Sequence, residues 1–491
     1  MTRLVLFTAC VLGLACGAAS TDSESLERPP NFVVIFIDDM GYGDIGPFGS
    51  TLNRTPNLDR MAAEGMKLTS FYAHPVCTPS RASLITGSYP IRNGLQTGAW
   101  HPVLMPGDEQ GIHDNEVTIA EVLKQKDYAT AIIGKWHLGD QPEFLPTRHG
   151  FDYYYGLPYS NDMNPAMPRN PRDHPPLPLL RGEQVLQEVV DQSFLTGEYT
   201  REAVRFIEQH KGQPFLVYLP HSMVHVPLYA GENFRGKSNN GILGDAIEEL
   251  DWSVGEILGK IRNLGLEKDT LVVFTSDNGP ARGSAGPLRG RKGSTYEGGM
   301  REPTIAWRPG TVPASSSYDG VASTMDLLPT FASLAGAALP EDRELDGHDI
   351  SAILAGDVDL PSPYEYLFYY RGYELRAVRG GEWKLHTNGE LYNLLADIGE
   401  TNDVAADNPA IVSRLEQALE SARTELGDGP QWPIDPGIRL GVNARPVGKI
   451  DRAPKFRIPR HGKAGDEGHS PVIKTRTTPP PPPDWKRPEN W

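Results

Sequence analysis

The run of residues with the clearest chemical potential places a cysteine directly before an expected helix. It reads Cys77-Thr78-Pro79-Ser80-Arg81. Thr78 can cap a helix whose first position is Pro79, and Gly87 supplies a stop. A helix N-terminus attracts anions through its free N–H groups, and the planar guanidinium of Arg81 suits sulfate or phosphate oxygens. The run therefore predicts a nucleophile, Cys77, beside an anion-binding site.

Oxygen ligands follow two of the expected strands. They are Asp38, Asp39, Asp277 and Asn278. The first pair ends the apolar run 31–37 and the second follows the apolar run 271–274, so both fall at the carboxyl ends of strands, where parallel sheets bind ligands. Each pair alone is usually a cap or a tight turn. Together they predict a site for a hard divalent cation, with Ca²⁺ preferred over Mg²⁺ because calcium tolerates irregular, high coordination.

Several further motifs agree in type and in order with a known family. They are Leu84-Ile85-Thr86-Gly87, Gly134-Lys135-Trp136-His137-Leu138-Gly139 and the stretch from Gly290 to Pro303. With the two sites above, they resemble the signature of the type I sulfatases, in the arylsulfatase A and N-acetylgalactosamine-6-sulfatase branch. The resemblance covers roughly residues 31–404, which is nearly the whole globular chain.

The resemblance implies a chemistry and a set of site residues. The motif cysteine, here Cys77, would be converted before folding to formylglycine by a maturation enzyme, and its hydrate would be the nucleophile. The implied metal ligands are Asp38, Asp39, Cys77, Asp277 and Asn278, and the residues implied around the sulfate are Arg81, Lys135, His137, Ser160, His225 and Lys292. His225 and Lys292 would protonate the leaving oxygen, and His137 would remove a proton when sulfate is released. The expected reaction is hydrolysis of a sulfate monoester, either a sulfated carbohydrate or an aryl sulfate.

Two other functions stay open at this level. One is a phosphodiesterase or phosphonate monoester hydrolase of the same superfold, and the other is a non-catalytic binder of sulfated glycans. The net charge of -16 argues against nucleic acid as a partner, because nucleic-acid binding requires clustered cations. The sequence leaves the oligomeric state and the natural substrate undetermined.

Apolar runs and helical stripes alternate along the first two thirds of the chain, which predicts a parallel sheet covered by helices on both faces. The expected strands are 31–37, 130–133, 215–219 and 271–274, and the longest expected helix is 246–264. We therefore expect an α/β catalytic domain over residues 31–346 with a large, mostly parallel sheet, which the resemblance makes an alkaline-phosphatase-like sandwich. Residues 158–180 are expected to form a long surface loop. Short strands and a last helix predict a smaller α+β subdomain with an antiparallel sheet over 347–430, followed by a Pro-rich basic tail over 431–491.

The first 19 residues have the pattern of an export signal, with Arg3 before a short apolar run and small residues after it. The apolar run is too short to span a bilayer. We expect an exported protein, periplasmic or secreted, with lipoprotein anchoring at Cys16 as the alternative. Of the three cysteines, Cys10 and Cys16 lie in this segment, so ordinary cleavage leaves Cys77 alone and rules out an internal disulfide.

Overall fold

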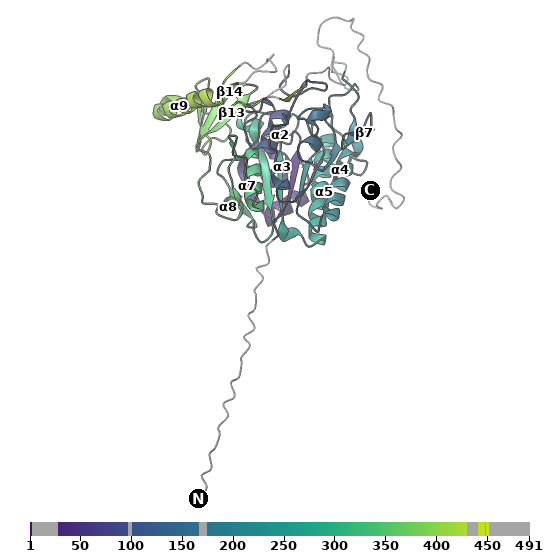
Figure 1. Cartoon of the computed structure of the whole chain (residues 1–491). Helices are drawn as coiled ribbons and strands as arrows, with labels where there is room; N and C mark the ends of the chain where they lie inside the picture. Colours follow the sequence, from purple (N-terminus) through teal and green to yellow (C-terminus); the bar gives the residue numbers. More distant parts are fainter. Residues whose placement is uncertain (2–27, 97–100, 166–173, 430–439, 447, 451–491) are drawn as a thin grey trace.

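A computed structural model describes residues 1, 28–96, 101–165, 174–429, 440–446 and 448–450 of the chain (Figure 1). The expected export signal, apart from Met1, and its Cys16 lie outside the described residues, as does most of the expected basic tail. No helix in the described part of the chain is both long enough and apolar enough to cross a membrane.

A large mixed sheet forms the centre of the molecule (Figure 1). Among the described residues it contains eleven strands in the order β11-β2-β10-β9-β1-β8-β4-β5-β6-β7, with β12 paired to β2. Their bounds are β1 Asn31–Ile37, β2 Met66–Tyr72, β4 Ala129–Ile133, β5 Tyr153–Gly156, β6 Leu179–Arg181, β7 Gln184–Gln187, β8 Phe215–Pro220, β9 Thr270–Ser276, β10 Arg301–Trp307, β11 Ser316–Tyr318 and β12 Ala322–Ser323. β1 lies between β8 and β9 and is parallel to both. This confirms the expected parallel centre.

Alternate side chains of β1 face two separate cores, because successive residues of a strand point to opposite faces. Phe32, Val34 and Phe36 join the core covered by α2, α3, α7 and α8, whereas the odd-numbered residues of β1 join the core covered by α1, α4 and α5. The helices are α1 Pro56–Glu64, α2 Cys77–Thr86, α3 Ile119–Lys124, α4 Leu195–Gln209, α5 Gly241–Asn263, α7 Leu327–Ala335 and α8 Ser351–Leu354. Figure 1 shows α4 and α5 on one side of the sheet and α3 and α7 on the other.

A second, smaller sheet follows in sequence. β13 Leu367–Arg371, β14 Glu374–Gly380, β15 Trp383–His386 and β16 Leu391–Asn393 form it, all antiparallel, and α9 Pro409–Glu425 packs on it. Its core includes Tyr72 and Met300 of the larger part, so the two parts share one apolar cluster. The antiparallel sheet and its helix agree with the α+β unit expected after the catalytic domain.

Short elements complete the described chain. They are the short helix α6 Glu297–Met300, the strand pair β3 Gln110–Gly111 and β17 Gly448–Lys449, and the 3₁₀ turns η1 Tyr42–Asp44, η2 Gly46–Phe48, η3 Pro142–Phe144, η4 Pro146–Arg148, η5 Gln192–Phe194, η6 Glu267–Asp269, η7 Thr324–Asp326 and η8 Ala405–Asp407. Because β17 pairs with β3, the described end of the chain is held against the catalytic part.

The sheet is mostly parallel as expected, with β10 lying between β9 and β2 and antiparallel to both. Two expectations about local structure were wrong. Thr78 does not cap α2, since the helix begins at Cys77 and the Thr78 hydroxyl donates to the His137 carbonyl at 3.2 Å. The stretch 158–180 is not simply a surface loop, since residues 158–161, 163 and 164 are buried and 179–180 belong to β6. The expected stop at Gly87 is confirmed, with a left-handed φ of 64°.

Candidate active site

The candidate site lies at the carboxyl ends of the central strands. Asp38 and Asp39 follow β1, Asp277 and Asn278 follow β9, and Cys77 begins α2. The Asp277 N–H donates to the Ile37 carbonyl at 2.9 Å, which extends the β1–β9 pairing to the site. Asp39 has a positive φ of 62°, a conformation that residues with a side chain seldom adopt unless the surroundings impose it. The fold therefore brings together residues about 240 positions apart in sequence.

Three cations face three carboxylates there. The Lys135 ammonium lies 2.6 Å from Asp38, and the Arg81 guanidinium lies 2.8 Å from Asp277 and 3.3 Å from Asp38. The Lys292 ammonium lies 2.5 Å from Asp39 and 3.4 Å from the Cys77 sulfur. All of these groups have fully buried side chains except Lys292, whose side chain is 19% exposed. The carboxylates and cations offset one another, so an anionic group could approach without meeting net negative charge.

Burial and charge set the protonation of these groups. Burial alone would raise the pKa of Asp38, but Lys135, His225 and Arg81 together hold that pKa well below its usual range. Burial and the charge of Asp38 raise the pKa of Asp277 to about 6. Burial favours the neutral form of Lys292, yet its carboxylate neighbours, Asp39 first, keep the pKa of this ammonium well above its usual range. Lys292 is therefore a charged donor in the site.

The donor set suits a hard cation. Ligating atoms of Asp38, Asp39, Cys77 and His225 lie within 4.8 Å of one another. Two further observations point to a missing positive partner, because Asp39 Oδ2 and Asn278 Oδ1 are buried with no hydrogen-bond donor. Buried acceptors without a donor are rare in folded proteins. Both Asp277 oxygens already accept hydrogen bonds, from Asp39 N–H at 3.0 Å and from Arg81 at 2.8 Å. The residues present thus fit a divalent cation between the β1 and β9 ends.

The Cys77 thiol is poorly suited to act as a nucleophile itself. It is 2% exposed, and burial and the charge of Asp38 raise its pKa far above the usual thiol value. Only the thiolate attacks electrophiles efficiently. An unmodified thiol at this place is therefore protonated and unreactive.

The two histidines differ in their hydrogen bonds. His137 Nε2 is 2.9 Å from the Leu104 carbonyl, so this nitrogen carries the proton, while Nδ1 is buried with no partner. Burial, Lys135 and Arg81 lower the pKa of His137 well below its usual range, which keeps it neutral and leaves a free lone pair on Nδ1. His225 Nδ1 is 2.6 Å from the Val226 carbonyl, and Nε2 lies 3.8 Å from Asp39 Oδ2. His137 is thus arranged as a proton acceptor, and His225 presents Nε2 to the site.

Ser160 lies in the site as expected, since Lys135 donates to its hydroxyl at 3.1 Å. Sequence reasoning missed Leu104, whose carbonyl orients His137 and which carries no motif. It also missed Glu302 in β10, which is fully buried with neither carboxyl oxygen bonded. Burial, Asp277 and Asp39 raise the pKa of Glu302 well above its usual range, so it is a neutral acid behind the site. Its position within the motif stretch from Gly290 to Pro303 was the signal that could have identified it.

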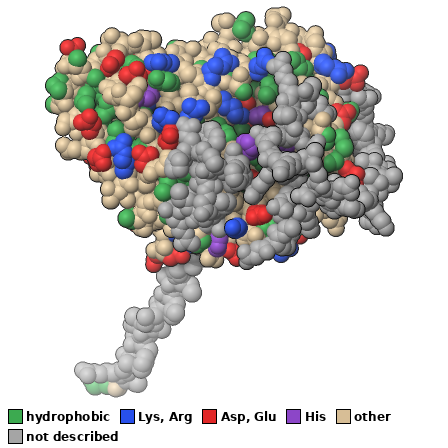
Figure 2. Space-filling view, turned by 90° about the horizontal axis from the view of Figure 1, so that it is seen from above, with side chains coloured by type: hydrophobic (Ala, Val, Ile, Leu, Met, Phe, Trp, Pro, Cys, Tyr) green, Lys and Arg blue, Asp and Glu red, His purple; other side chains and the backbone are tan. Residues whose placement is uncertain are grey.

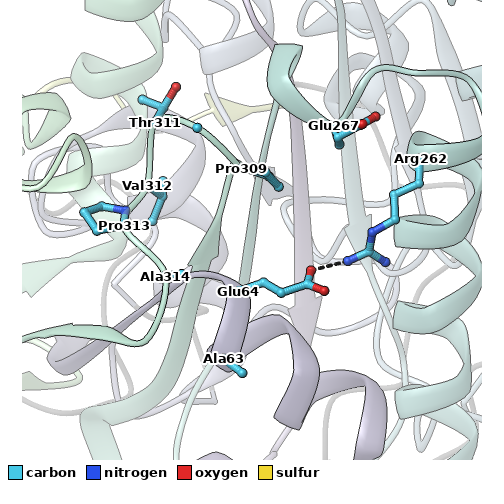
Figure 3. A pocket seen from close by; sticks show the side chains of 10 residues that line it. Ala63, Glu64, Arg262, Glu267, Pro309, Thr311, Val312, Pro313 and Ala314 are labelled. Atoms are coloured by element: carbon cyan, nitrogen blue, oxygen red, sulfur yellow. Dashed lines mark hydrogen bonds and ion pairs between the residues drawn. The ribbon is translucent and has the colours of Figure 1, made fainter.

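A hollow in the described surface lies away from this site. It has a volume of about 700 Å³, and Glu64, Arg262, Glu267 and residues 309–314 line it (Figure 3). Glu267 precedes β9 while Asp277 follows it, so the strand's length, about 20 Å, separates this hollow from the site. Arg262 is already paired with Glu64 there. Figure 2 shows the molecule from above in the view of Figure 1, with several Lys and Arg side chains in a band across the upper part of the face.

Comparison with known proteins agrees with this geometry. A family model described as Sulfatase matches residues 30–337. N-acetylgalactosamine-6-sulfatase of Canis lupus familiaris is 41% identical over 79% of this chain and 77% of its own, and arylsulfatase A of Homo sapiens is 42% identical over 85% and 90%. The crystal structure of Ps i-CgsB in complex with k-i-k-neocarrahexaose has a TM-score of 0.70 and 30% identity, and covers 80% of this chain and 92% of that one.

These relatives are matched over most of their own length, and the fold is the alkaline-phosphatase-like α/β sandwich with a small antiparallel sheet that the resemblance implied. The phosphoryl-transfer and non-catalytic alternatives gain no support from them. The chain belongs to the sulfatase family and is an enzyme that hydrolyses sulfate esters.

Proposed function

We propose that this enzyme removes sulfate from a sulfated carbohydrate, with formylglycine formed from Cys77 as the nucleophile and calcium as the metal. The observation that carries the proposal is the buried cluster in which Asp38, Asp39, Cys77 and Lys292 meet, with acceptors left unpaired. The preference for a carbohydrate rests on relatives whose names specify N-acetylgalactosamine 6-sulfate hydrolysis. Aryl sulfates are the expected artificial substrates.

The metal would be held by Asp38, Asp39, Asp277, Asn278 and residue 77. When bound, it supplies a Lewis acid that withdraws charge from oxygen and stabilises the negative charge of the transition state. The unpaired atoms Asp39 Oδ2 and Asn278 Oδ1 support this ligand set. His225 Nε2, at 3.8 Å from Asp39 Oδ2, is close enough to compete as a ligand.

Residue 77 provides the nucleophile after modification. Hydrated formylglycine has two hydroxyls on one carbon, so one can attack sulfur and the other gives the route by which sulfate leaves. Serine has a single hydroxyl and lacks that route. The raised pKa of the Cys77 thiol supports the modification, since the unmodified side chain is unreactive here.

Arg81, Lys135 and Lys292 would bind the sulfate and offset its charge. Their donors are aligned by Asp38, Asp39 and Asp277 before substrate arrives, so little reorganisation is needed when charge develops. Ser160, which accepts from Lys135, fixes that ammonium and would contact a sulfate oxygen. Holding the ester in one orientation contributes to rate as well as to affinity.

His225 and Lys292 would protonate the leaving oxygen. Because the Val226 carbonyl holds the Nδ1 proton of His225, Nε2 can donate only when the ring is an imidazolium. His137 would accept a proton at Nδ1 when sulfate is released, and its neutral state and free lone pair support that role.

Mass spectrometry tests the proposal directly. Protein made in a host with a formylglycine-generating enzyme should yield a peptide in which residue 77 carries an aldehyde. C77S and C77A should keep the wild-type melting profile and lose nearly all release of sulfate from 4-nitrocatechol sulfate. Fully active protein in which Cys77 is entirely a free thiol would refute the proposal.

A panel of sulfated mono- and oligosaccharides, assayed for free sulfate, tests the substrate class. We expect turnover of at least one sugar sulfate, with 4-nitrophenyl phosphate turned over much more slowly than 4-nitrophenyl sulfate. We also propose export of the protein, based on the signal pattern of its first 19 residues; N-terminal sequencing of protein from an expressing cell would test it.

A further inference from the structure

The segment that carries Lys292 is hydrogen-bonded at three points to the small C-terminal sheet and to Glu400, which follows that sheet in sequence. The backbone N–H of Glu297 donates to Glu400 Oε2 at 2.7 Å, and the Lys384 ammonium donates to the Thr295 carbonyl at 2.8 Å. The Arg289 guanidinium donates to the Glu400 carbonyl at 2.7 Å. Segment 289–297 is therefore held by hydrogen bonds on the side that faces away from the active site.

A buried ion cluster forms the centre of this attachment. The Lys384 ammonium lies 2.9 Å from Glu297 Oε1 and 2.9 Å from Glu400 Oε1, and the side chains of all three are 0% exposed. His386 Nε2 lies 3.0 Å from the same Glu400 oxygen. Burying two carboxylates and an ammonium is costly unless each is paired with good geometry, so this arrangement is specific to one relative position of the two parts.

The other side of the same segment contacts the active site. The Gly293 N–H donates to the Pro75 carbonyl at 2.8 Å, two residues before Cys77. Next to it, the Lys292 ammonium reaches Asp39 at 2.5 Å and the Cys77 sulfur at 3.4 Å. Segment 289–297 thus spans directly from the ion cluster to the nucleophile.

Glu400 holds a conformation that its surroundings must impose. Its φ is 49°, in the left-handed region that residues with a side chain rarely adopt. Both carboxyl oxygens and its backbone carbonyl are used, and all three bond to the Lys292 segment or to Lys384. Non-glycine residues in such conformations occur where function or packing fixes them.

We propose that Glu400 and Lys384 are positioning residues for Lys292, so that the small C-terminal sheet sets the place of a catalytic ammonium that it does not itself supply. This inference rests on the proposed function, in which Lys292 binds sulfate and helps to protonate the leaving oxygen. Neither residue contacts the reacting atoms. Loss of the attachment displaces Lys292, and small displacements of a catalytic group reduce rate strongly.

A double-mutant cycle tests the inference. E400Q keeps the size of the side chain and removes its charge, and R289Q removes an exposed tether without opening a cavity. Each should lower kcat/KM for 4-nitrophenyl sulfate by about tenfold, mainly in kcat, with a larger loss for poorer leaving groups. In a K292A background, each should cost less than about twofold, because the residue through which they act is gone.

D403N is the matched control. Asp403 lies in the same stretch, and its carboxylate accepts hydrogen bonds from the Leu391 and Ala405 N–H groups, both of which lie outside segment 289–297. It should leave kcat/KM within about twofold of wild type while changing the melting temperature. If E400Q does not fold, R289Q decides the question by the same cycle.

The positioning role would be overturned if E400Q and R289Q lowered kcat/KM as much in the K292A background as in the wild-type background. A loss of kcat/KM in D403N as large as in E400Q would also overturn it. Wild-type activity of K292A alone would instead refute the catalytic role of Lys292, and the inference with it. If K292A is impaired but E400Q and R289Q lower kcat/KM by the same factor with and without K292A, the proposed function stands and only the positioning role is refuted.

Discussion

Glu249 should make the enzyme less stable as the pH rises from 5 to 8. It lies in α5, is 4% exposed, and accepts one hydrogen bond from the Gly231 N–H at 2.8 Å. Burial raises its pKa from 4.5 to about 7, and the Gly231 bond offsets only part of that rise. Because the folded-state pKa exceeds the unfolded one, the folded protein binds more protons between these values. Stability is then fully present below pH 4.5 and is lost as the pH rises through 7.

The size of the effect follows from the shift. A difference of roughly 2.5 pKa units at about 1.4 kcal/mol each gives about 3 kcal/mol. The unfolding entropy of a chain of this length is about 1 kcal/mol/K, so the melting temperature should change by about 3 °C. E249Q cannot titrate, and its free energy of unfolding relative to wild type should rise by about 3 kcal/mol between pH 4.5 and 8.

Urea and thermal unfolding at several pH values, with calcium held constant, measure this difference. E248Q is the matched control, because Glu248 is the next residue of the same helix and pairs with exposed Arg54 at the surface. The free energy of unfolding of E248Q should change with pH in parallel with that of wild type. Parallel curves for wild type and E249Q between pH 5 and 8 would refute the reasoning.

Three further predictions concern the site. Removing the metal with EDTA should lower both the melting temperature and the rate of sulfate release, and added calcium should restore both, because a ligand that binds only the folded state stabilises that state. Elemental analysis of active protein that finds no stoichiometric divalent metal would contradict this. K135A leaves Asp38 without its nearest cation and should cost about 3–5 kcal/mol in urea unfolding, whereas a cost below about 1 kcal/mol would mean that the pair is not buried as described. H225A should lose most activity on substrates with poor leaving groups, whereas H137A should release one equivalent of alcohol quickly and then turn over slowly. Rapid-quench kinetics would measure this difference, and the reverse pattern would mean that the two histidines have exchanged roles.

Much of the fold could be predicted from local patterns. The apolar run 31–37 is β1 as expected, and the oxygen ligands at its end lie beside those of β9 because parallel strands end at one edge. The antiparallel β10 was not among the expected strands, because its first residues, Arg301 to Pro303, belong to the glycine-rich motif and its apolar run is short. Its pairing depends on β2 and β9, which are distant in the chain.

The chemical groups of the site were also predictable from residue type, but their supports were not. Lys135, Lys292 and the two histidines stand in short motifs, so the sequence indicates them. Their partners are less visible, because a backbone carbonyl such as that of Leu104 leaves no trace in the sequence. Glu400, in turn, lies more than 100 residues from the segment it holds.

The burial of Cys77 has a consequence for biosynthesis. Its side chain is covered once α2 packs against the sheet, and the sheet needs β9 and β10, whose residues follow Cys77 by roughly 190 to 230 positions. Synthesis at about 5–20 residues per second delays that closure by about 10–50 seconds, and pairing between such distant strands is itself slow. If Cys77 is converted to formylglycine as proposed, the modifying enzyme has a limited period in which the residue is reachable. Preparations should then contain a fraction of permanently inactive molecules. Lower growth temperature or more of the modifying enzyme should change that fraction, whereas treatment after purification should not.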